Sequence, residues 1–422
     1  MDFSQARDQT IADLQISIQR FNRWLETEGF ASYDPYDIWG TAYGLFARRL
    51  YYQRNPLGVP LIAPILLLEM VAPRLRGLFV RKQQFATADG QLLLAYLNLY
   101  AVTRDESCLA TARRLGDELL KLSIPGFSGH CWGYPFDWQN NRGLWRRNTP
   151  FITATPYCYE AFAGLFDATG EDSFRNVAVS AAKFVYQDLK DTPTGPGAAA
   201  SSYGPHDDSQ VINASAYRAF VLFHAARRFG LEDYLDKARA NLKFILQNQR
   251  PDGSWYYAVN SPGKPFIDNF HTCFVIKSLV KIHRLWPGEV DWAAVERGYA
   301  YYRQALFDHD DQPKSFAVEP RTQIVKLEMY NMAEGITLGA LLGERIPDAR
   351  SLAIKLAGRL REQYQLPAGH FVTRVFLGGL RHTLPFLRWP QAQLFYSLTN
   401  LLKALSDDGV AVGAAAESVA VV

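Results

Sequence analysis

One pattern limits the folds that this chain can adopt: pairs of helix-period segments follow one another about every sixty residues. The first segment of each pair is apolar around its whole circumference, which is typical of a buried helix. The second segment carries charged residues on one face, as an outer helix does. Short joints such as ATGEDS and RFGLEDY predict antiparallel hairpins. The first segments begin near residues 91, 157, 213, 270, 330 and 391.

Helical hairpins that repeat at this period stack on their neighbours. An open solenoid needs a polar cap at each end, whereas a closed ring does not. We therefore predict an all-α protein, an α/α toroid (barrel) of six to seven helical hairpins, with an open solenoid as the alternative. The N-terminal helices, residues 3–29 and about 37–53, are expected to supply the remaining hairpin. We expect one toroid domain over residues 1–408, followed by a flexible tail over 409–422.

The composition excludes some classes of partner. The chain has 422 residues, of which 48% are hydrophobic and 21% are charged, an ordinary globular balance. The net charge is only +3, and binding to nucleic acid needs clustered Lys and Arg, so no nucleic-acid partner is expected. Aromatic residues reach 14%, and surplus Trp and Tyr often line pockets.

The four cysteines predict neither a disulfide framework nor a zinc module, because no CxxC pair occurs. His271 and Cys273 are two residues apart on an expected helix, so their side chains diverge by about 200°. We expect no metal and no cofactor. The N-terminal stretch is amphipathic without a signal-peptide core, which favours a cytoplasmic protein with reduced thiols.

The most apolar stretch, residues 57–73, is too short for a membrane span and contains Glu69 and three prolines. The favoured interpretation is a buried helix with a connector. Arg74, Arg76, Arg81 and Lys82 follow closely, so the alternative is a peripheral contact of residues 57–82 with a membrane surface.

In each repeat the long loops precede the inner helix, so a ring would gather them at one end. Several of these loops are rich in aromatic residues, as in GHCWGYPFDWQ and DGSWYY. We expect their rings to rim a central cavity and to hold the apolar faces of sugars. The alternative is packing within the loops themselves. The candidates are Trp132, Tyr134, Trp138, Trp255 and Tyr256.

The stretches WGYPFDWQ, DGSWYY, IDNFHTCFVIKSL and RWPQAQLFYSL resemble a family of uncharacterised proteins found with exopolysaccharide and surface-glycan biosynthesis. The resemblance covers roughly residues 85–405. It implies kinship with the six-hairpin glycosidase-like toroids, which include glycoside hydrolases, polysaccharide lyases and sugar epimerases. One fold hosts many chemistries, so the resemblance implies the fold more specifically than the reaction.

Sugar chemistry in such a ring needs ionisable groups at the cavity. Asp137 lies between two large rings, where burial would raise its pKa and suit it to a general acid; the alternative is a turn residue. Asp268 and His271 begin an inner helix, where either Asp268 or Asn269 is a candidate N-cap and His271 is a candidate proton shuttle. Tyr330 and Glu334 share one face of another inner helix. Glu334 is expected to be either functional or paired with an Arg of a neighbouring hairpin.

Further polar residues at the starts of inner helices are candidates for binding the substrate. An Arg suits a carboxylate or a phosphate, and amides suit hydroxyl groups. These candidates are Asn213, Asn269, Arg388, Trp389 and Gln391.

The preferred hypothesis is therefore a carbohydrate-active enzyme, of the glycoside hydrolase, lyase or sugar epimerase kind. It would act on an oligosaccharide, a polysaccharide or a glycan intermediate through a cofactor-free acid/base pair. One alternative is a non-catalytic glycan-binding or assembly partner in a polysaccharide biosynthesis complex. The other is a toroidal cyclase or transferase that acts on a lipid-linked substrate, which the apolar stretch 57–73 would help.

Overall fold

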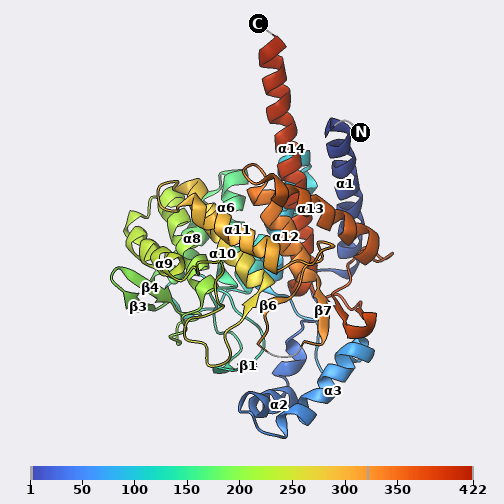
Figure 1. The fold of residues 1–422 in the computed structure, drawn as a ribbon, viewed down its shortest axis with the longest axis vertical. Coiled ribbons are helices and arrows are strands. Elements are labelled where there is room, and N and C mark those ends of the chain that lie inside the picture. Colours follow the sequence, from blue (N-terminus) through green and yellow to red (C-terminus); the bar gives the residue numbers. More distant parts are fainter. Residues whose placement is uncertain (1–2, 321–322, 421–422) are drawn as a thin grey trace.

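The helices of the chain form a closed ring with an inner and an outer layer (Figure 1). The computed structural model describes the backbone of residues 3–320 and 323–420 and the side chains of residues 5–320 and 323–407. Each inner helix packs against the next, and the last packs against the first, which closes the ring. The inner helices are α4 (Ala86–Thr103), α6 (Thr155–Thr169), α8 (Ile212–Phe229), α10 (Asn269–Leu285), α12 (Met329–Leu342) and α14 (Ala392–Ala420).

An outer helix covers each inner helix, so the predicted all-α toroid is confirmed, and the open solenoid is not formed. The outer helices are α5 (Glu106–Lys121), α7 (Asp172–Gln187), α9 (Leu235–Gln247), α11 (Trp292–Ala305), α13 (Pro347–Arg359) and α1 (Phe3–Glu28).

The sixth pair joins the two ends of the described chain, because α1 packs on α14. Phe21 of α1 stacks on Phe395 of α14, with 4.8 Å between the ring centroids. The prediction that residues 37–53 complete this hairpin is wrong. They form a short 3₁₀ helix, η1 (Asp37–Gly40), and α2 (Ala42–Tyr52), which lie outside the ring. The division of the chain into a domain and a tail stays a prediction, and α14 runs to Ala420.

Local sequence sets where the ring helices begin and end. Gly170 and Gly230 follow α6 and α8 with φ of 72°, a left-handed conformation that glycine adopts without a steric cost. Asp105 and Asp291 cap α5 and α11, since each carboxylate accepts a hydrogen bond from a backbone N–H of the first turn. These stops and starts produce the tight joints that let two helices fold back on each other.

Small antiparallel sheets and long loops gather at the end of the ring where the inner helices begin (Figure 1). This position agrees with the predicted clustering of the loops. The strands are β1 (Trp138–Asn140), β2 (Gly143–Trp145), β3 (Asp191–Gly195), β4 (Ala198–Ser201), β5 (Ile267–Asp268), β6 (Phe316–Val318), β7 (Val325–Glu328), β8 (Arg374–Phe376) and β9 (Arg381–His382).

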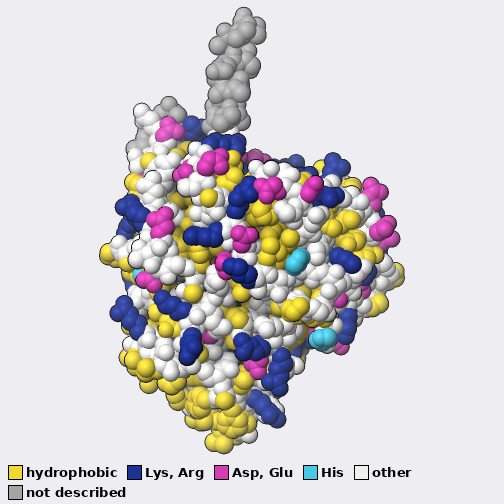
Figure 2. All heavy atoms as spheres, turned by 180° about the vertical axis from the view of Figure 1, so that it is seen from behind, with side chains coloured by type: hydrophobic (Ala, Val, Ile, Leu, Met, Phe, Trp, Pro, Cys, Tyr) yellow, Lys and Arg dark blue, Asp and Glu magenta, His cyan; other side chains and the backbone are white. Residues whose placement is uncertain are grey.

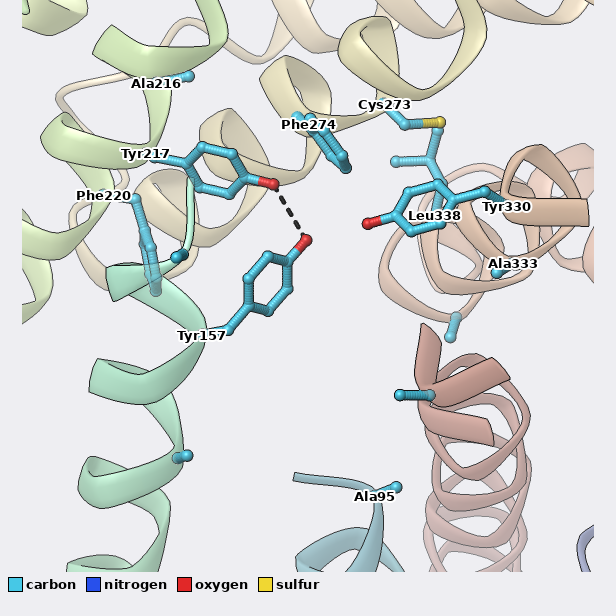
Figure 3. Packing of buried hydrophobic residues seen from close by; sticks show 14 of the residues in the cluster. Ala95, Tyr157, Ala216, Tyr217, Phe220, Cys273, Phe274, Tyr330, Ala333 and Leu338 are labelled. Carbon is cyan, nitrogen blue, oxygen red and sulfur yellow. Dashed lines mark hydrogen bonds between the residues drawn. The ribbon is translucent and has the colours of Figure 1, made fainter. Parts of the chain in front are cut away.

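Side chains narrow the middle of the ring to a cavity of about 30 Å³ that five inner helices, α6, α8, α10, α12 and α14, line. Tyr157 of α6 and Tyr217 of α8 share a hydrogen bond of 3.0 Å between their hydroxyls, and the hydroxyl of Tyr330 from α12 points toward them (Figure 3). All three side chains are buried, and burial raises the pKa of each hydroxyl well above its ordinary value. The tyrosines therefore stay protonated and link three inner helices across the axis.

Residues 34–82 fold into a unit that protrudes beyond the loop end of the ring (Figure 1). It contains η1, α2, α3 (Gly58–Val71) and a second 3₁₀ helix, η2 (Pro73–Leu78). Its centre is the fully buried Arg76, which binds Asp37 and Glu69 through ion pairs. Apolar residues of α3 face outward, so the predicted buried helix at 57–73 is wrong.

No helix in the described residues is both long enough and apolar enough to cross a membrane.

Two glycines of the α12–α13 hairpin give opposite predictions. A Cβ at Gly339 would lie 2.3 Å from the Ala349 carbonyl oxygen and 2.4 Å from the Ala353 Cβ, so Gly339→Ala is expected to destabilise the fold by about 1–3 kcal/mol. A Cβ at Gly358 in α13 would meet nothing within 4 Å, so Gly358→Ala is expected to stabilise the fold by up to about 1 kcal/mol. Chemical denaturation of both variants checks the pair. Equal effects would contradict the close approach of α12 and α13.

Candidate functional site

Asp268 and His271 form a hydrogen-bonded pair at the start of α10. The Asp268 carboxylate caps the helix by accepting from the His271 backbone N–H at 3.1 Å, which confirms the predicted N-cap. Its other oxygen lies 2.6 Å from His271 Nδ1. This contact fixes the proton of the neutral imidazole on Nδ1, so Nε2 is the basic nitrogen. Nε2 has no hydrogen-bond partner among the side chains that the structure describes, and the His271 side chain is 20% exposed.

The pair borders a small cavity between α8, α10 and the loop after α9. The cavity measures about 10 Å³, which is room for a single water molecule. Asn213, in the first turn of α8, presents an amide that is 1% exposed, and neither of its polar atoms has a partner in the described chain. A buried amide without partners is costly unless a ligand or water binds it. Trp255 and Tyr256 complete this wall of the cavity, so the structure brings five predicted site residues together.

The ring of Tyr257 lies next to the His271 imidazole, and the sequence analysis did not select Tyr257 as a site residue. Its ring centroid lies 4.5 Å from that of His271, and its ring stacks on Phe266 at 4.7 Å. Burial, followed by the negative charge of Asp268, raises the pKa of Tyr257 above its ordinary value. Its hydroxyl is therefore protonated at neutral pH and suits hydrogen-bond donation. The signal was present, since Tyr257 directly follows two chosen residues in DGSWYY.

Phe270 connects this pair with a second aromatic cluster on the far side of its ring. Its centroid lies 4.3 Å from that of His271, 5.1 Å from that of Trp389 and 5.8 Å from that of Tyr330. Tyr330 and Trp389 stack face to face with 3.7 Å between centroids. The predicted residues Tyr330 and Trp389 therefore lie in the same aromatic cluster as His271, although each is already packed against another ring.

Glu334 lies deeper in the ring and is fully buried. It forms an ion pair with Lys277 of α10, and it accepts a hydrogen bond of 2.5 Å from the Gln393 amide. Burial raises the pKa of Glu334, and the charge of Lys277 offsets part of this effect. The expected partner was an Arg of a neighbouring hairpin, and the structure has a Lys there instead. Lys277 could have been found from the sequence, because it is a lone cation in the apolar run FVIKSL.

Asp137 makes its contacts within its own loop. Its carboxylate forms an ion pair of 3.1 Å with Arg146 and accepts from the Arg147 backbone N–H at 2.7 Å. The side chain of Arg146 is 74% exposed. The side chain of Asp137 itself is 19% exposed and its carboxylate is held by its own loop, so its role as a general acid stays a prediction.

The other aromatic residues of this loop pack against the protein. Trp132 is fully buried and donates its indole N–H to the Leu119 carbonyl at 2.8 Å, so it offers no face to a ligand. Trp138 and Tyr134 pack edge to face with 6.0 Å between centroids. The indole nitrogen of Trp138 is buried and has no partner in the described chain.

Three predicted binding residues already have internal partners. The Arg388 guanidinium binds the buried Asp34 carboxylate through two hydrogen bonds of 2.5 and 2.8 Å. The side-chain oxygen of Gln391 accepts from the Phe371 backbone N–H at 2.9 Å, and its side-chain nitrogen donates to the Phe371 carbonyl at 2.7 Å. Asn269 donates to a backbone carbonyl and accepts from Tyr302 at 3.2 Å. These three side chains hold loops and helices in place, and Asp34 was not foreseen.

Asp89, in the first turn of α4, is a buried carboxyl group that the sequence analysis missed. It is 0% exposed, and neither oxygen has a hydrogen-bond partner in the described chain. Burial raises the pKa of Asp89 well above its ordinary value, and the nearby charge of Glu118 adds to this effect. The folded protein therefore holds a proton here that the unfolded chain releases.

This proton makes stability depend on pH. The unfolded Asp ionises near pH 3.9, so folding becomes less favourable by about 1.4 kcal/mol per pH unit from there up to the raised pKa. Asp89→Asn removes the titration. The variant is expected to gain stability relative to the wild type as the pH rises from 5 to 7. Denaturation midpoints of the two proteins at both pH values measure the gain, and a constant difference would contradict a neutral, buried Asp89.

Comparisons with solved structures support the fold. An unsaturated glucuronyl hydrolase specific for heparin is similar with a TM-score of 0.60 and 14% identity over 95% of this chain and 98% of that chain. The unsaturated glucuronyl hydrolase of Bacillus sp. GL1 gives 0.57 and 13% over 94% and 96%. A sugar epimerase from a ruminal bacterium gives 0.59 and 10% over 77% and 88%. No family model and no curated protein matches the sequence. At these identities the likeness shows the fold, and that fold is the α/α toroid.

Proposed function

We propose that the protein is an enzyme that transfers a proton at a sugar carbon next to a carbonyl or carboxyl group, and so epimerises a glycan unit or eliminates from it. One observation carries this proposal: the Asp268 carboxylate orients His271 with its basic nitrogen free, beside the buried and unpartnered amide of Asn213. An oriented imidazole is an efficient base near neutral pH. An unpartnered amide suits a sugar hydroxyl.

In the proposed step, His271 Nε2 removes the proton of the carbon, and Asp268 stabilises the imidazolium that forms. The electron pair moves to the adjacent carbonyl or carboxyl oxygen. In epimerisation a water molecule delivers a proton to the opposite face of the carbon, and the imidazolium then releases its proton to solvent. In elimination the bond from the next carbon to its oxygen breaks, and the leaving oxygen takes the proton that the imidazolium carries. Tyr257 supports either outcome because its protonated hydroxyl belongs to the same cluster.

Hydrolysis has less support from this arrangement. It requires two carboxyl groups that flank one glycosidic bond about 5–10 Å apart. The other predicted carboxylates are already bound, Asp137 to Arg146 in its own loop and Glu334 to Lys277 inside the ring. Each of these carboxylates already has a charged partner, whereas Nε2 of His271 has no hydrogen-bond partner among the described side chains.

A sugar ring does not fit a cavity of about 10 Å³, so the substrate has to displace part of the wall. Tyr256 and Tyr257, which line that wall, begin the loop of residues 256–266, and Asn260 ties this loop to the neighbouring loops. The Asn260 side chain accepts from Arg142 at 3.0 Å and from the Gln210 backbone at 2.9 Å. Substrate entry in this proposal breaks these two contacts.

The proposed setting is the cytoplasmic metabolism of a surface glycan or exopolysaccharide. Its support is the resemblance of the four quoted sequence stretches to proteins of that biosynthesis. Solved structures with the same fold include a cellobiose 2-epimerase from Bacillus thermoamylovorans and a polysaccharide lyase, so the fold accommodates both proposed reactions.

Deuterium exchange tests the proposal directly. The protein is incubated in D₂O with reducing disaccharides and with uronate-containing oligosaccharides, and NMR follows deuterium at the carbons next to carbonyl or carboxyl groups. We expect exchange with one of the two sugar classes, and we expect His271→Gln to abolish it. Elimination would show itself as a carbon–carbon double bond in the product, because the carbon that lost its proton takes up no deuterium. Bond cleavage with neither exchange nor a double bond in the product would overturn the proposal in favour of hydrolysis. Sugar binding without exchange or cleavage would favour a glycan-binding protein.

A further inference from the structure

The protruding unit of residues 34–82 exposes apolar side chains that a folded protein normally buries. Leu67 and Val71 are one helical turn apart on α3 and are 62% and 68% exposed. Leu75 and Leu78 on η2 and the following Phe79 are 51%, 77% and 62% exposed. Figure 2 shows hydrophobic side chains gathered at this end of the molecule. We call these five residues the apolar tip.

The apolar tip belongs to a firmly folded element. Arg76, within η2, is fully buried and binds Asp37, Glu69 and the Asp34 carbonyl at 2.5 Å. These bonds fix η2 against α3 and η1. The exposed side chains are therefore displayed at set positions and do not result from a loose segment.

The same unit concentrates positive charge. Residues 34–82 contain seven cations, and the four that lie in or next to η2 include the exposed Arg74, Arg81 and Lys82. Over residues 42–82 the only carboxylate is Glu69, which Arg76 neutralises. This segment thus has a net charge of +6 in a chain whose total is +3. Arg74 also borders a cavity of about 210 Å³ directly beside η2, where Lys82 pairs with Glu28 at 3.2 Å.

We propose that the apolar tip docks this protein onto the surface of an anionic phospholipid bilayer. Exposed leucine and phenylalanine side chains enter the boundary between headgroups and acyl chains, and the surrounding cations bind the lipid phosphates. A second copy of the chain is less suited to cover the apolar tip, because a twofold interface would bring two units of residues 34–82, each with a net charge of +4, against each other. The absence of a membrane-spanning helix among the described residues agrees with contact at the surface.

Docking sets the orientation of the ring. The apolar tip projects from the end where the loops gather and the Asp268–His271 pair lies, and α14 leaves the ring at the opposite end (Figure 1). A docked molecule therefore turns its loop end toward the bilayer. Docking does not depend on the chemistry proposed for His271.

Vesicle sedimentation tests the docking with the full chain. The wild type is expected to bind vesicles of phosphatidylcholine mixed with phosphatidylglycerol more tightly than vesicles of phosphatidylcholine alone, and added salt should weaken this binding. Changing Leu75, Leu78 and Phe79 to Ser is expected to lower partitioning by at least about a hundredfold. Arg74→Gln combined with Arg81→Gln should lower partitioning into the anionic vesicles by roughly fivefold per charge.

A control variant replaces Ile16, an apolar residue of α1 that is 49% exposed, by Ser and should bind like the wild type. Light scattering of the free proteins reports their mass in solution. The proposal is overturned if the wild type binds neither vesicle, if the control loses binding to the same extent, or if the wild type is a dimer that the tip variant dissociates. Deuterium exchange in solution remains a separate readout, so a failure of docking and a failure of the proposed chemistry are distinguishable.

Discussion

His271→Gln is expected to lower turnover by roughly 10²- to 10⁴-fold, the range that removal of a general base commonly causes. The glutamine amide can still donate a hydrogen bond to Asp268, so the start of α10 keeps its contacts. It cannot take up a proton at neutral pH. Turnover of the substrate identified by deuterium exchange is the measurement, together with a denaturation midpoint for each variant.

Asp268→Asn is the matched control because asparagine caps a helix about as well as aspartate does. The fold should therefore retain its stability, while the imidazole loses its carboxylate partner. Turnover should fall by up to about 10⁴-fold, the loss that the corresponding change causes in Ser-His-Asp triads. Asp268→Ala should lose the cap as well, at a cost of about 1 kcal/mol. If the Asn variant kept full activity, Asp268 would be a cap alone.

Glu334→Gln is expected to destabilise the fold by about 3–5 kcal/mol, because it leaves the buried Lys277 without a counter-charge. Lys277→Met should have a similar cost for the same reason. The double variant should recover most of the loss, since both charges are removed and the glutamine still accepts from Gln393. Chemical denaturation of the three variants forms a double-mutant cycle.

A catalytic Glu334 would give the opposite pattern. Activity would then vanish in Glu334→Gln while the denaturation midpoint stayed close to that of the wild type. The cycle therefore decides between the two roles that the sequence left open for this residue.

The repeat predicted the ring because it depends on local rules. Glycines and capping aspartates mark the helix ends, and an apolar circumference marks an inner helix, as Gly170, Gly230 and Asp105 illustrate. The Asp268–His271 pair could also be predicted from the sequence, since both residues lie in one turn at the start of a helix. These features involve residues that are close in sequence.

Contacts between distant residues explain the failures. Arg388 looked available for a substrate, but Asp34, 354 positions away, binds it. The pairing of α1 with α14 depends on a similar distance along the chain, so nothing near residue 37 revealed that the next helix would leave the ring. The exposure of α3 could not be predicted either. An apolar stretch of sequence shows the same pattern whether the helix packs in a core or faces a surface.

The closure of the ring by its first and last helices has a consequence for biosynthesis. During translation α1 emerges first, yet its partner α14 emerges only after the five other inner helices. Until then the incomplete barrel presents the bare flanks of α4 and α12 to the surrounding medium. Nascent chains should therefore depend on holding chaperones until α14 has emerged and closed the ring.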